Sequence, residues 1–330
     1  MRESEAIERL RRIASGPAAL GLKDDVALLD DLVVTHDTIA EGVHFLPFDP
    51  PASVGWKLVA VNLSDLAGKG ATPAAALLSL ALSGDDDWDS HFLDGVEAAC
   101  ESYDLPLVGG DTIALPPGSG RVLGMTVIGR AGERVPLRSG GKAGDALWLA
   151  GAIGDSAAGL VQLRADGAST GPLVDVYRRP VPLLATGRAL APHADAMMDV
   201  SDGLLIDASH MADASGLGAV IDLDALPLSS AYRRIRGEDR SARLFAATGG
   251  DDYALLAALP PELDPLRLSL PDRTTIARVG TLTAEGPLLS LVSGGIPVPL
   301  PERLGFEHAA IEHRGNGPRG DSPPPVAGRG

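Results

Sequence analysis

The chain has 330 residues, a length that favours two domains of ordinary size over a single core. Its apolar content of 45% and charged content of 22% are typical of a soluble globular protein. The net charge of −16 argues against a nucleic-acid backbone or an anionic membrane as the main partner, although metal ions and backbone amides still allow an acidic protein to bind phosphates.

The single cysteine, Cys100, excludes an internal disulfide and any metal site built from a cysteine cluster. Its apolar neighbours have helical spacing, which predicts a buried core residue rather than a reactive thiol. The first residues are polar and lack a signal-peptide apolar segment. The longest apolar run, 74–82, is too short to span a membrane. We therefore expect a cytoplasmic enzyme or binding protein.

Helices and strands are expected to alternate in the first half of the chain. The pattern predicts an amphipathic helix at 4–13, a short buried strand at 32–34 and a helix at 53–69 that ends before Gly70. The remaining elements expected in this half are a strand at 74–82, a helix at 88–103, and strands at 105–108 and 122–128.

A shift to Gly, Arg and Lys between residues 129 and 144 predicts a domain boundary, which we place after residue 135. The N-terminal domain then covers 1–135 and the C-terminal domain 136–312, and a Pro/Gly-rich tail at 313–330 is expected to be disordered. The strands expected in the second half are 146–149, 197–200, 219–223, 254–258, 275–279 and 288–292, and helices are expected after residue 154 and at 204–214, 229–235 and 242–247.

Acidic residues gather around the strand at 32–34, with Asp24 and Asp25 before it and Asp37 after it. Unpaired carboxylates at this density repel one another, so we expect a cation among them. The alternative is a set of solvated turn residues. On the helix at 53–69, Asn62, Asp65 and Lys69 share one face. The polar side chains of this face either have partners inside the protein or form a solvated helix edge.

Three further stretches combine glycine with acids. The loop expected at 109–112, Gly-Gly-Asp-Thr, would let the backbone approach a ligand while Asp111 points at it, and residues 249–251 repeat the Gly-Gly-Asp pattern. The glycine-rich turn at 151–154 opens a helix whose amides either hold an anion or are simply capped. Asp199 and Asp202 form a second acidic focus where a strand passes into a helix.

Carboxylate and hydroxyl oxygens of this kind suit Mg²⁺, which typically bridges carboxylates to substrate phosphates. The glycine-rich turn at 151–154 matches neither the Walker A nor the G-x-G-x-x-G pattern, and no nucleophile or base is evident. Phosphoryl transfer fits such a site, because positioning and charge neutralisation supply most of its catalysis.

Eight short motifs follow one another along the chain: Gly21-x-x-Asp24-Asp25-x-Ala27, Thr35-x-Asp37-Thr38 with Glu41-Gly-Val-His44-Phe45, Asn62-Leu-Ser-Asp65-Leu, Gly109-Gly-Asp111-Thr112, Arg138-Ser-Gly, Gly154-Asp-Ser-Ala-Ala-Gly159-Leu, Asp199-Val-Ser201-Asp202-Gly-Leu and Gly250-Asp-Asp-Tyr253. Their order resembles that of the bacterial thiamine-monophosphate kinase family, in the aminoimidazole ribonucleotide synthetase superfamily. The resemblance spans residues 3–312.

The resemblance implies ATP-dependent phosphorylation of thiamine monophosphate to thiamine diphosphate, by direct transfer with several Mg²⁺ ions and no dedicated base or nucleophile. It implies an α+β two-domain fold, in which the sheet of a mixed α/β N-terminal domain pairs across a homodimer and an α+β C-terminal domain closes over the nucleotide. The implied metal ligands are Asp25, Thr35, the His36 carbonyl, Asp37, Asp65, Asp111, Asp199 and Asp202. The implied nucleotide contacts are Gly110, Asp111, Arg138 and Ser201, and the implied substrate contacts are His44, Asp251 and Phe306.

Two departures from the family pattern stand beside the acids. Lys23 replaces a common glycine and places a cation where a metal ion is expected, and His36 replaces a common threonine. Three superfamily members are rivals: selenophosphate synthetase, hydrogenase maturation protein and aminoimidazole ribonucleotide synthetase. The first typically uses a cysteine or selenocysteine near its N-terminus and the second a C-terminal cysteine, and the chain has neither. A non-catalytic protein that binds metal or nucleotide is the alternative from another class.

Overall fold

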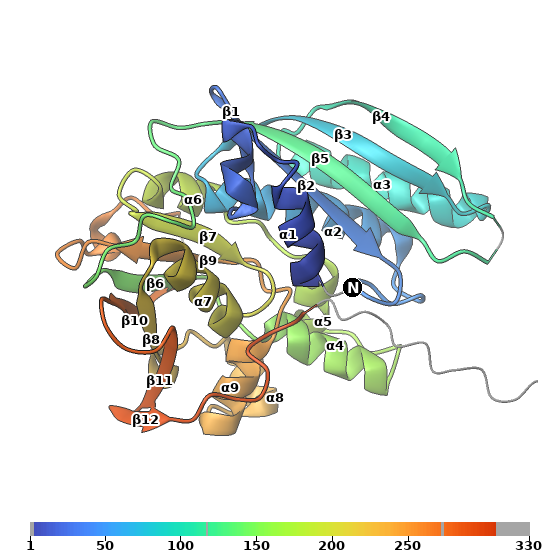
Figure 1. Ribbon diagram of the computed structural model, residues 1–330. Coiled ribbons are helices and arrows are strands. Elements are labelled where there is room, and N and C mark those ends of the chain that lie inside the picture. The colour runs from blue at the N-terminus through green and yellow to red at the C-terminus, as the bar shows by residue number, and fades with distance from the viewer. Residues whose placement is uncertain (1–2, 117, 272–273, 308–330) are drawn as a thin grey trace, which may run out of the picture.

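The computed structural model describes residues 3–116, 118–271 and 274–307, which form two mixed sheets with helices packed on them and between them (Figure 1). The predicted disordered tail lies outside these residues. The predicted α+β class is confirmed by this arrangement and by the family comparison below. Pairing of the N-terminal sheet across a dimer and the boundary after residue 135 stay predictions.

The first sheet has the strand order β1-β2-β5-β3-β4, in which only β3 and β4 run parallel. Its strands are β1 (Ala27–Leu29), β2 (Leu32–Ala40), β3 (Thr72–Leu82), β4 (Leu107–Ala114) and β5 (Val122–Arg130). The helices of this half are α1 (Glu3–Arg11), the 3₁₀-helix η1 (Pro17–Leu22), α2 (Pro51–Gly68) and α3 (Asp86–Ser102).

The second sheet has the order β12-β11-β8-β10-β6-β9-β7. Its strands are β6 (Ala146–Ala150), β7 (Ala196–Val200), β8 (Gly218–Asp222), β9 (Ala254–Leu259), β10 (Ile276–Thr283), β11 (Leu289–Ser293) and β12 (Ile296–Val298). The helices of this half are α4 (Asp155–Ala165), α5 (Pro172–Arg178), α6 (Leu184–Leu190), α7 (Leu204–Ser215), η2 (Leu223–Ala225), α8 (Ser230–Arg236), α9 (Arg240–Thr248) and η3 (Pro265–Arg267).

Helix α2 joins the two halves, because it packs against α3, β2 and β5 on one side and against α6 and β7 on the other (Figure 1). Nearly all of its residues are buried, including polar ones such as Asn62 and Asp65. At Gly68 a Cβ atom would lie 2.9 Å from the backbone nitrogen of Asp199. The glycine therefore allows the end of α2 to touch β7, which brings acids of the two halves together.

Several expectations need correction. Residues 109–112 were expected to form a loop, and this is wrong because they lie within β4, where pairing with β3 satisfies their backbone. β2 extends to Ala40, so Asp37 lies inside a strand rather than after one. Helices α5 and α6 and strand β12 were not predicted. Cys100 is half-buried at the edge of the core rather than fully buried, and burial raises the pKa of its thiol.

Within the described residues, no helix combines the length and the apolar character needed to cross a membrane.

Candidate functional site

A pocket of about 470 Å³ between the two halves collects most of the predicted site residues. Its walls come from β2, α2, α4, the end of β7 and the loop before β9. The predicted residues that line it are Asp25, Asp37, His44, Asp65, Arg138, Asp199, Ser201, Asp202, Asp251 and Phe306.

Three of these acids form a compact cluster. Asp25, Asp65 and Asp199 each offer a carboxylate oxygen, and these three oxygens lie within 4.8 Å of one another. They come from the segment before β1, from α2 and from β7, so only the packing of α2 between the halves brings them together. Asp37 of β2 lines the same pocket. These acids are therefore not ordinary solvated turn residues, because they cluster at the pocket.

The acids are held by neighbours on α2 and β2. The hydroxyl of Ser64 donates a hydrogen bond to Asp199 Oδ2 at 2.6 Å. The hydroxyl of Thr35 donates to Asp65, so Thr35 lies against the acidic cluster without lining the pocket. The backbone N–H of Asp37 donates to Asn62 Oδ1 at 3.0 Å. Asn62 is therefore buried and satisfied, and this face of α2 is not a solvated edge.

A buried lysine neutralises the acids that precede β1. Lys69 Nζ lies 2.6 Å from Asp24 Oδ1 and 3.5 Å from Asp25 Oδ2, and it also donates to the Met197 carbonyl at 3.0 Å. The side chain of Lys69 is fully buried, whereas Lys23 is exposed. The lysine beside these acids is thus Lys69, which stands far from them in the sequence, and not the adjacent Lys23.

Burial and mutual repulsion shift the acids of the pocket. Burial, with repulsion from Asp25 and Asp202, raises the pKa of Asp37 to about 6. Burial and the charge of Asp25 raise the pKa of Asp199 to about 7, and burial with repulsion from neighbouring acids raises the pKa of Asp65 well above its usual value. The charged forms of these carboxylates are therefore disfavoured in the protein interior unless a cation compensates them.

Asp25 behaves differently from the other acids. Burial alone would raise the pKa of Asp25, but the charges of Arg138 and Lys69 outweigh burial and lower it. Asp25 Oδ2 is buried and accepts no hydrogen bond from any described residue. An ionised carboxylate with an unused buried oxygen, beside acids that repel one another, fits a hard divalent cation with oxygen ligands.

Arg138 lies at the edge of the acidic cluster with one donor unused. Its guanidinium donates to Asp25, and its backbone N–H donates to Asp24 Oδ2 at 2.8 Å. Its Nε–H is buried and meets no acceptor in the described part of the chain. Arg138 therefore offers a positive charge and a free donor to an anionic group in the pocket.

The three predicted substrate contacts form a further part of the pocket wall. His44 accepts a hydrogen bond from the Ala40 backbone N–H at 3.0 Å through Nδ1. Asp251 has a positive φ of 67°, and its Oδ1 accepts from the Tyr253 hydroxyl at 2.9 Å. Phe306 is 45% exposed, and its backbone N–H donates to the Asp202 carbonyl at 2.9 Å. This wall combines an aromatic face with a carboxylate.

Sequence reasoning did not assign several residues at this pocket to the site, although it considered Tyr177 as a possible stacking partner for a base. Tyr177 and Arg164 line it, and Lys57 stands directly behind Asp251. Lys57 and Tyr177 carried a weak signal, since both are polar-tipped side chains inside apolar helical patterns. Nothing in the sequence marks exposed Arg164, because its role depends on where α4 packs.

The amides after the glycine-rich turn at 151–154 are already occupied. Asp252 is partly buried, and its carboxylate accepts from the backbone N–H of Gly154 at 2.6 Å and of Ser156 at 3.2 Å. The anion at the start of α4 is therefore a side chain of the chain itself.

Two sets of predicted residues lie elsewhere. Gly110 and Asp111 belong to exposed β4, at the opposite edge of the first sheet from β1, and do not line the pocket. Gly110 has a positive φ, and a Cβ there would lie 1.9 Å from the Leu78 carbonyl oxygen, so strand pairing alone requires this glycine. The exposed ring of His36 shares a hydrogen bond with Thr126 at 2.9 Å on the far face of β2. Roles in binding for these residues stay predictions.

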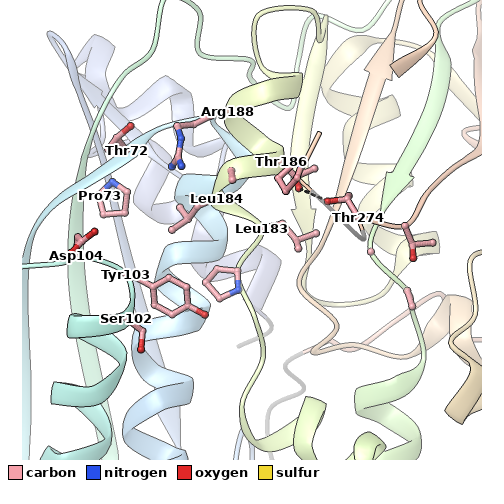
Figure 2. A pocket seen from close by; sticks show the side chains of 16 residues that line it. Thr72, Pro73, Ser102, Tyr103, Asp104, Leu183, Leu184, Thr186, Arg188 and Thr274 are labelled. Carbon is pink, nitrogen blue, oxygen red and sulfur yellow. Dashed lines mark hydrogen bonds between the residues drawn. The ribbon is translucent and has the colours of Figure 1, made fainter. Parts of the chain in front are cut away.

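A second and larger cavity, of about 660 Å³, lies on another part of the seam between the halves and is shown in Figure 2. Tyr103, Leu183 and Leu184 line it, and the hydroxyls of Thr186 and Thr274 meet at 3.2 Å on its wall. None of the predicted site residues lines it. The smaller pocket, which holds the acids and Arg138, is therefore the candidate active site.

Comparison with known proteins agrees with this architecture. Residues 23–131 match the family model "AIR synthase related protein, N-terminal domain", and residues 142–288 match "AIR synthase related protein, C-terminal domain". The chain belongs to this family of AIR synthase related proteins. The thiamine-monophosphate kinase of Salmonella typhimurium is 38% identical over 307 residues, which are 88% of this chain and 92% of that protein.

Two further relatives extend the likeness. The thiamine-monophosphate kinase of Caulobacter vibrioides is 38% identical over 320 residues, covering 91% of this chain and 88% of that protein. A solved structure described as AaThiL complexed with AMPPCP and TMP superposes with a TM-score of 0.80 at 30% identity, covering 93% of this chain and 97% of that chain.

Proposed function

We propose that this chain is a thiamine-monophosphate kinase, which transfers the terminal phosphoryl group of ATP to thiamine monophosphate and releases thiamine diphosphate and ADP. The observation that carries the proposal is the cluster of Asp25, Asp65 and Asp199 beside an arginine with an unused buried donor. Relatives with this name at 38% identity over most of the chain support it.

In the proposed mechanism, Asp25, Asp37, Asp65, Asp199 and Asp202 hold several Mg²⁺ ions, with Thr35 and the His36 carbonyl as further ligands. Bound Mg²⁺ would neutralise charge on the phosphates during transfer. The raised pKa values of Asp37, Asp65 and Asp199 support the assignment, because repelling carboxylates gain most from cations.

Arg138 and Ser201 are proposed to bind the ATP phosphates. The free Nε–H of Arg138 points to this role, since phosphate oxygens are strong acceptors. In the same pocket, His44, Asp251 and Phe306 are proposed to hold thiamine monophosphate. An aromatic face and a carboxylate suit its cationic thiazolium ring. The acceptor phosphate and the ATP phosphates would then face one another across the pocket, and direct transfer requires no further group.

We also propose a homodimer, a two-domain division after residue 135 and a cytoplasmic location. The outer strand β4 exposes Leu107, Val108 and Ile113, which supports burial against a second copy of this chain. Because Gly110 and Asp111 lie away from the pocket of their own protomer, a role for them in binding requires that they reach the site of the partner copy.

The direct test is turnover by the purified protein with ATP, thiamine monophosphate and Mg²⁺, measured as formation of thiamine diphosphate and ADP. The absence of product at millimolar Mg²⁺ would contradict the proposal. Binding of ATP and Mg²⁺ without turnover would support a non-catalytic binding protein. ADP formation whose rate does not depend on thiamine monophosphate would support another synthetase of the superfamily.

A further inference from the structure

Lys57, the lysine within α2, is buried behind the wall that carries the proposed substrate contacts. Its side chain is 2% exposed, and it does not line the pocket. Lys57 Nζ donates to Asp251 Oδ2 at 2.9 Å and to the His44 carbonyl at 2.8 Å. It also lies 4.2 Å from the centre of the Tyr177 ring. One ammonium group thus contacts three residues that line the pocket.

These three residues come from distant parts of the chain. His44 follows β2 in the first half, Tyr177 lies on α5, and Asp251 belongs to the loop before β9 in the second half. The Tyr253 hydroxyl also fixes the Asp251 carboxylate, by donating to Oδ1. Lys57 therefore fixes the second oxygen and ties that loop to the first half of the molecule.

The loop itself needs such a restraint. Asp251 and Tyr253 both have positive φ angles, of 67° and 53°, which residues other than glycine rarely adopt. Burying an ammonium group is also costly unless it is paired and hydrogen-bonded. A methionine at this position would fill the same space without that cost. The ion pair is thus better explained by the geometry it imposes than by stability alone.

We propose that Lys57 is a positioning residue for the thiamine-phosphate side of the pocket, acting through Asp251, His44 and Tyr177 rather than by touching substrate. The inference rests on the proposed function, since it assigns to Lys57 the alignment of that wall. It distinguishes Lys57, inside α2, from Lys69, the residue that follows α2: Lys57 serves the substrate wall, and Lys69 serves the acids.

The test compares Lys57→Met with Lys142→Met, which removes another lysine–aspartate pair, to Asp195, at an exposed lysine outside the pocket. We expect Lys57→Met to raise KM for thiamine monophosphate about tenfold or more, while KM for ATP stays within about twofold. Lys142→Met should leave both unchanged, and Lys57→Arg, which keeps the charge, should recover part of the loss. An unchanged KM for thiamine monophosphate, or an equal rise for both substrates, would overturn the inference.

A double-substitution cycle with Asp251→Asn tests whether Lys57 acts through Asp251. If Lys57 acts mainly through Asp251, the double variant Lys57→Met/Asp251→Asn should have the same KM for thiamine monophosphate as Asp251→Asn alone. Effects that simply multiply would overturn that route. If Lys57→Met does not fold because Asp251 is left unpaired, the double variant lacks that charge and is compared with Asp251→Asn in its place.

Calorimetric binding of thiamine monophosphate without ATP separates failure of this inference from failure of the proposed function. If the wild-type protein neither binds nor phosphorylates thiamine monophosphate, the proposed function is wrong and the inference falls with it. If the wild-type protein does both and Lys57→Met binds it equally well, only the inference is wrong.

Discussion

The tripeptide Gly-Gly-Asp occurs twice in this chain and adopts two different structures. At 109–111 it lies in the exposed edge strand β4, paired in parallel with β3. At 249–251 it forms a loop that crosses the end of β7, where the Asp251 N–H donates to the Ser201 carbonyl at 2.7 Å and the side chain lines the pocket. The same residues therefore meet an open surface in one place and the candidate active site in the other.

The difference lies in what surrounds each aspartate. Asp251 is fixed by Lys57 and Tyr253, and the conformation of its backbone is left-handed. Asp111 has an exposed side chain on a regular strand. A glycine pair before an acid thus lets the backbone come close to a neighbour, but the motif does not predict whether that neighbour is a ligand or another strand.

The largest loss of activity is expected from substituting an acid that belongs to neither Gly-Gly-Asp motif. Asp65→Asn removes an oxygen ligand from the cluster, and we expect activity to fall at least about 10³-fold because charge neutralisation is the main catalytic contribution. The melting temperature without Mg²⁺ should not fall, since one of several repelling carboxylates is lost. Steady-state kinetics and thermal unfolding measure the two effects. Activity within tenfold of the wild type would remove Asp65 from the site.

Substituting the two motif acids tests the comparison itself. Asp111→Asn should lower activity about 10²-fold, with partial recovery at high Mg²⁺, if a partner copy brings Asp111 to the metal site. Asp251→Asn should instead raise KM for thiamine monophosphate without changing the Mg²⁺ requirement. Kinetics at several Mg²⁺ concentrations separate the two. Identical behaviour of the two variants would show that the motifs do not differ in role.

The strand environment of the first motif can be tested through stability. Gly110→Ala should lower the free energy of unfolding by about 2–4 kcal/mol, because its Cβ would collide with the Leu78 carbonyl and its φ is positive. Gly109→Ala is the matched control, since its Cβ would meet a flexible Leu77 side chain at 3.3 Å. Denaturant unfolding measures both. Equal losses in the two variants would contradict the close pairing of β4 with β3.

A smaller effect is expected from pH on the metal-free protein. The pKa of Asp199 is raised to about 7 in the folded state, while an unfolded aspartate titrates near 3.9. Between these values the folded protein keeps a proton that the unfolded chain has released, so stability should fall as pH rises, by roughly 2 kcal/mol between pH 5 and 7. Asp199→Asn and added Mg²⁺ should each flatten this dependence in thermal unfolding. Stability that rises over the same interval would refute the assigned direction.

The sequence predicted the main features of the site from local patterns. Helical spacing placed Asn62 and Asp65 on one face of α2, and both lie at the acidic cluster. Local patterns failed where long-range neighbours decide. Lys69 could not be recognised as the counterion of Asp24, because 45 residues separate them in the sequence and only the packing of α2 brings them together. Asp252 likewise caps α4 from a position about 100 residues away, and no local pattern reports this.

By itself, the sequence determined most helices and strands, the family and the set of acids, because periodicity and short motifs are local properties. Tertiary structure alone decided how the two Gly-Gly-Asp motifs differ, which lysine serves which acid, and that Lys57 links the two halves at the substrate wall. These outcomes depend on contacts between segments far apart in the chain, whose free energy exists only once α2 is packed between the two sheets.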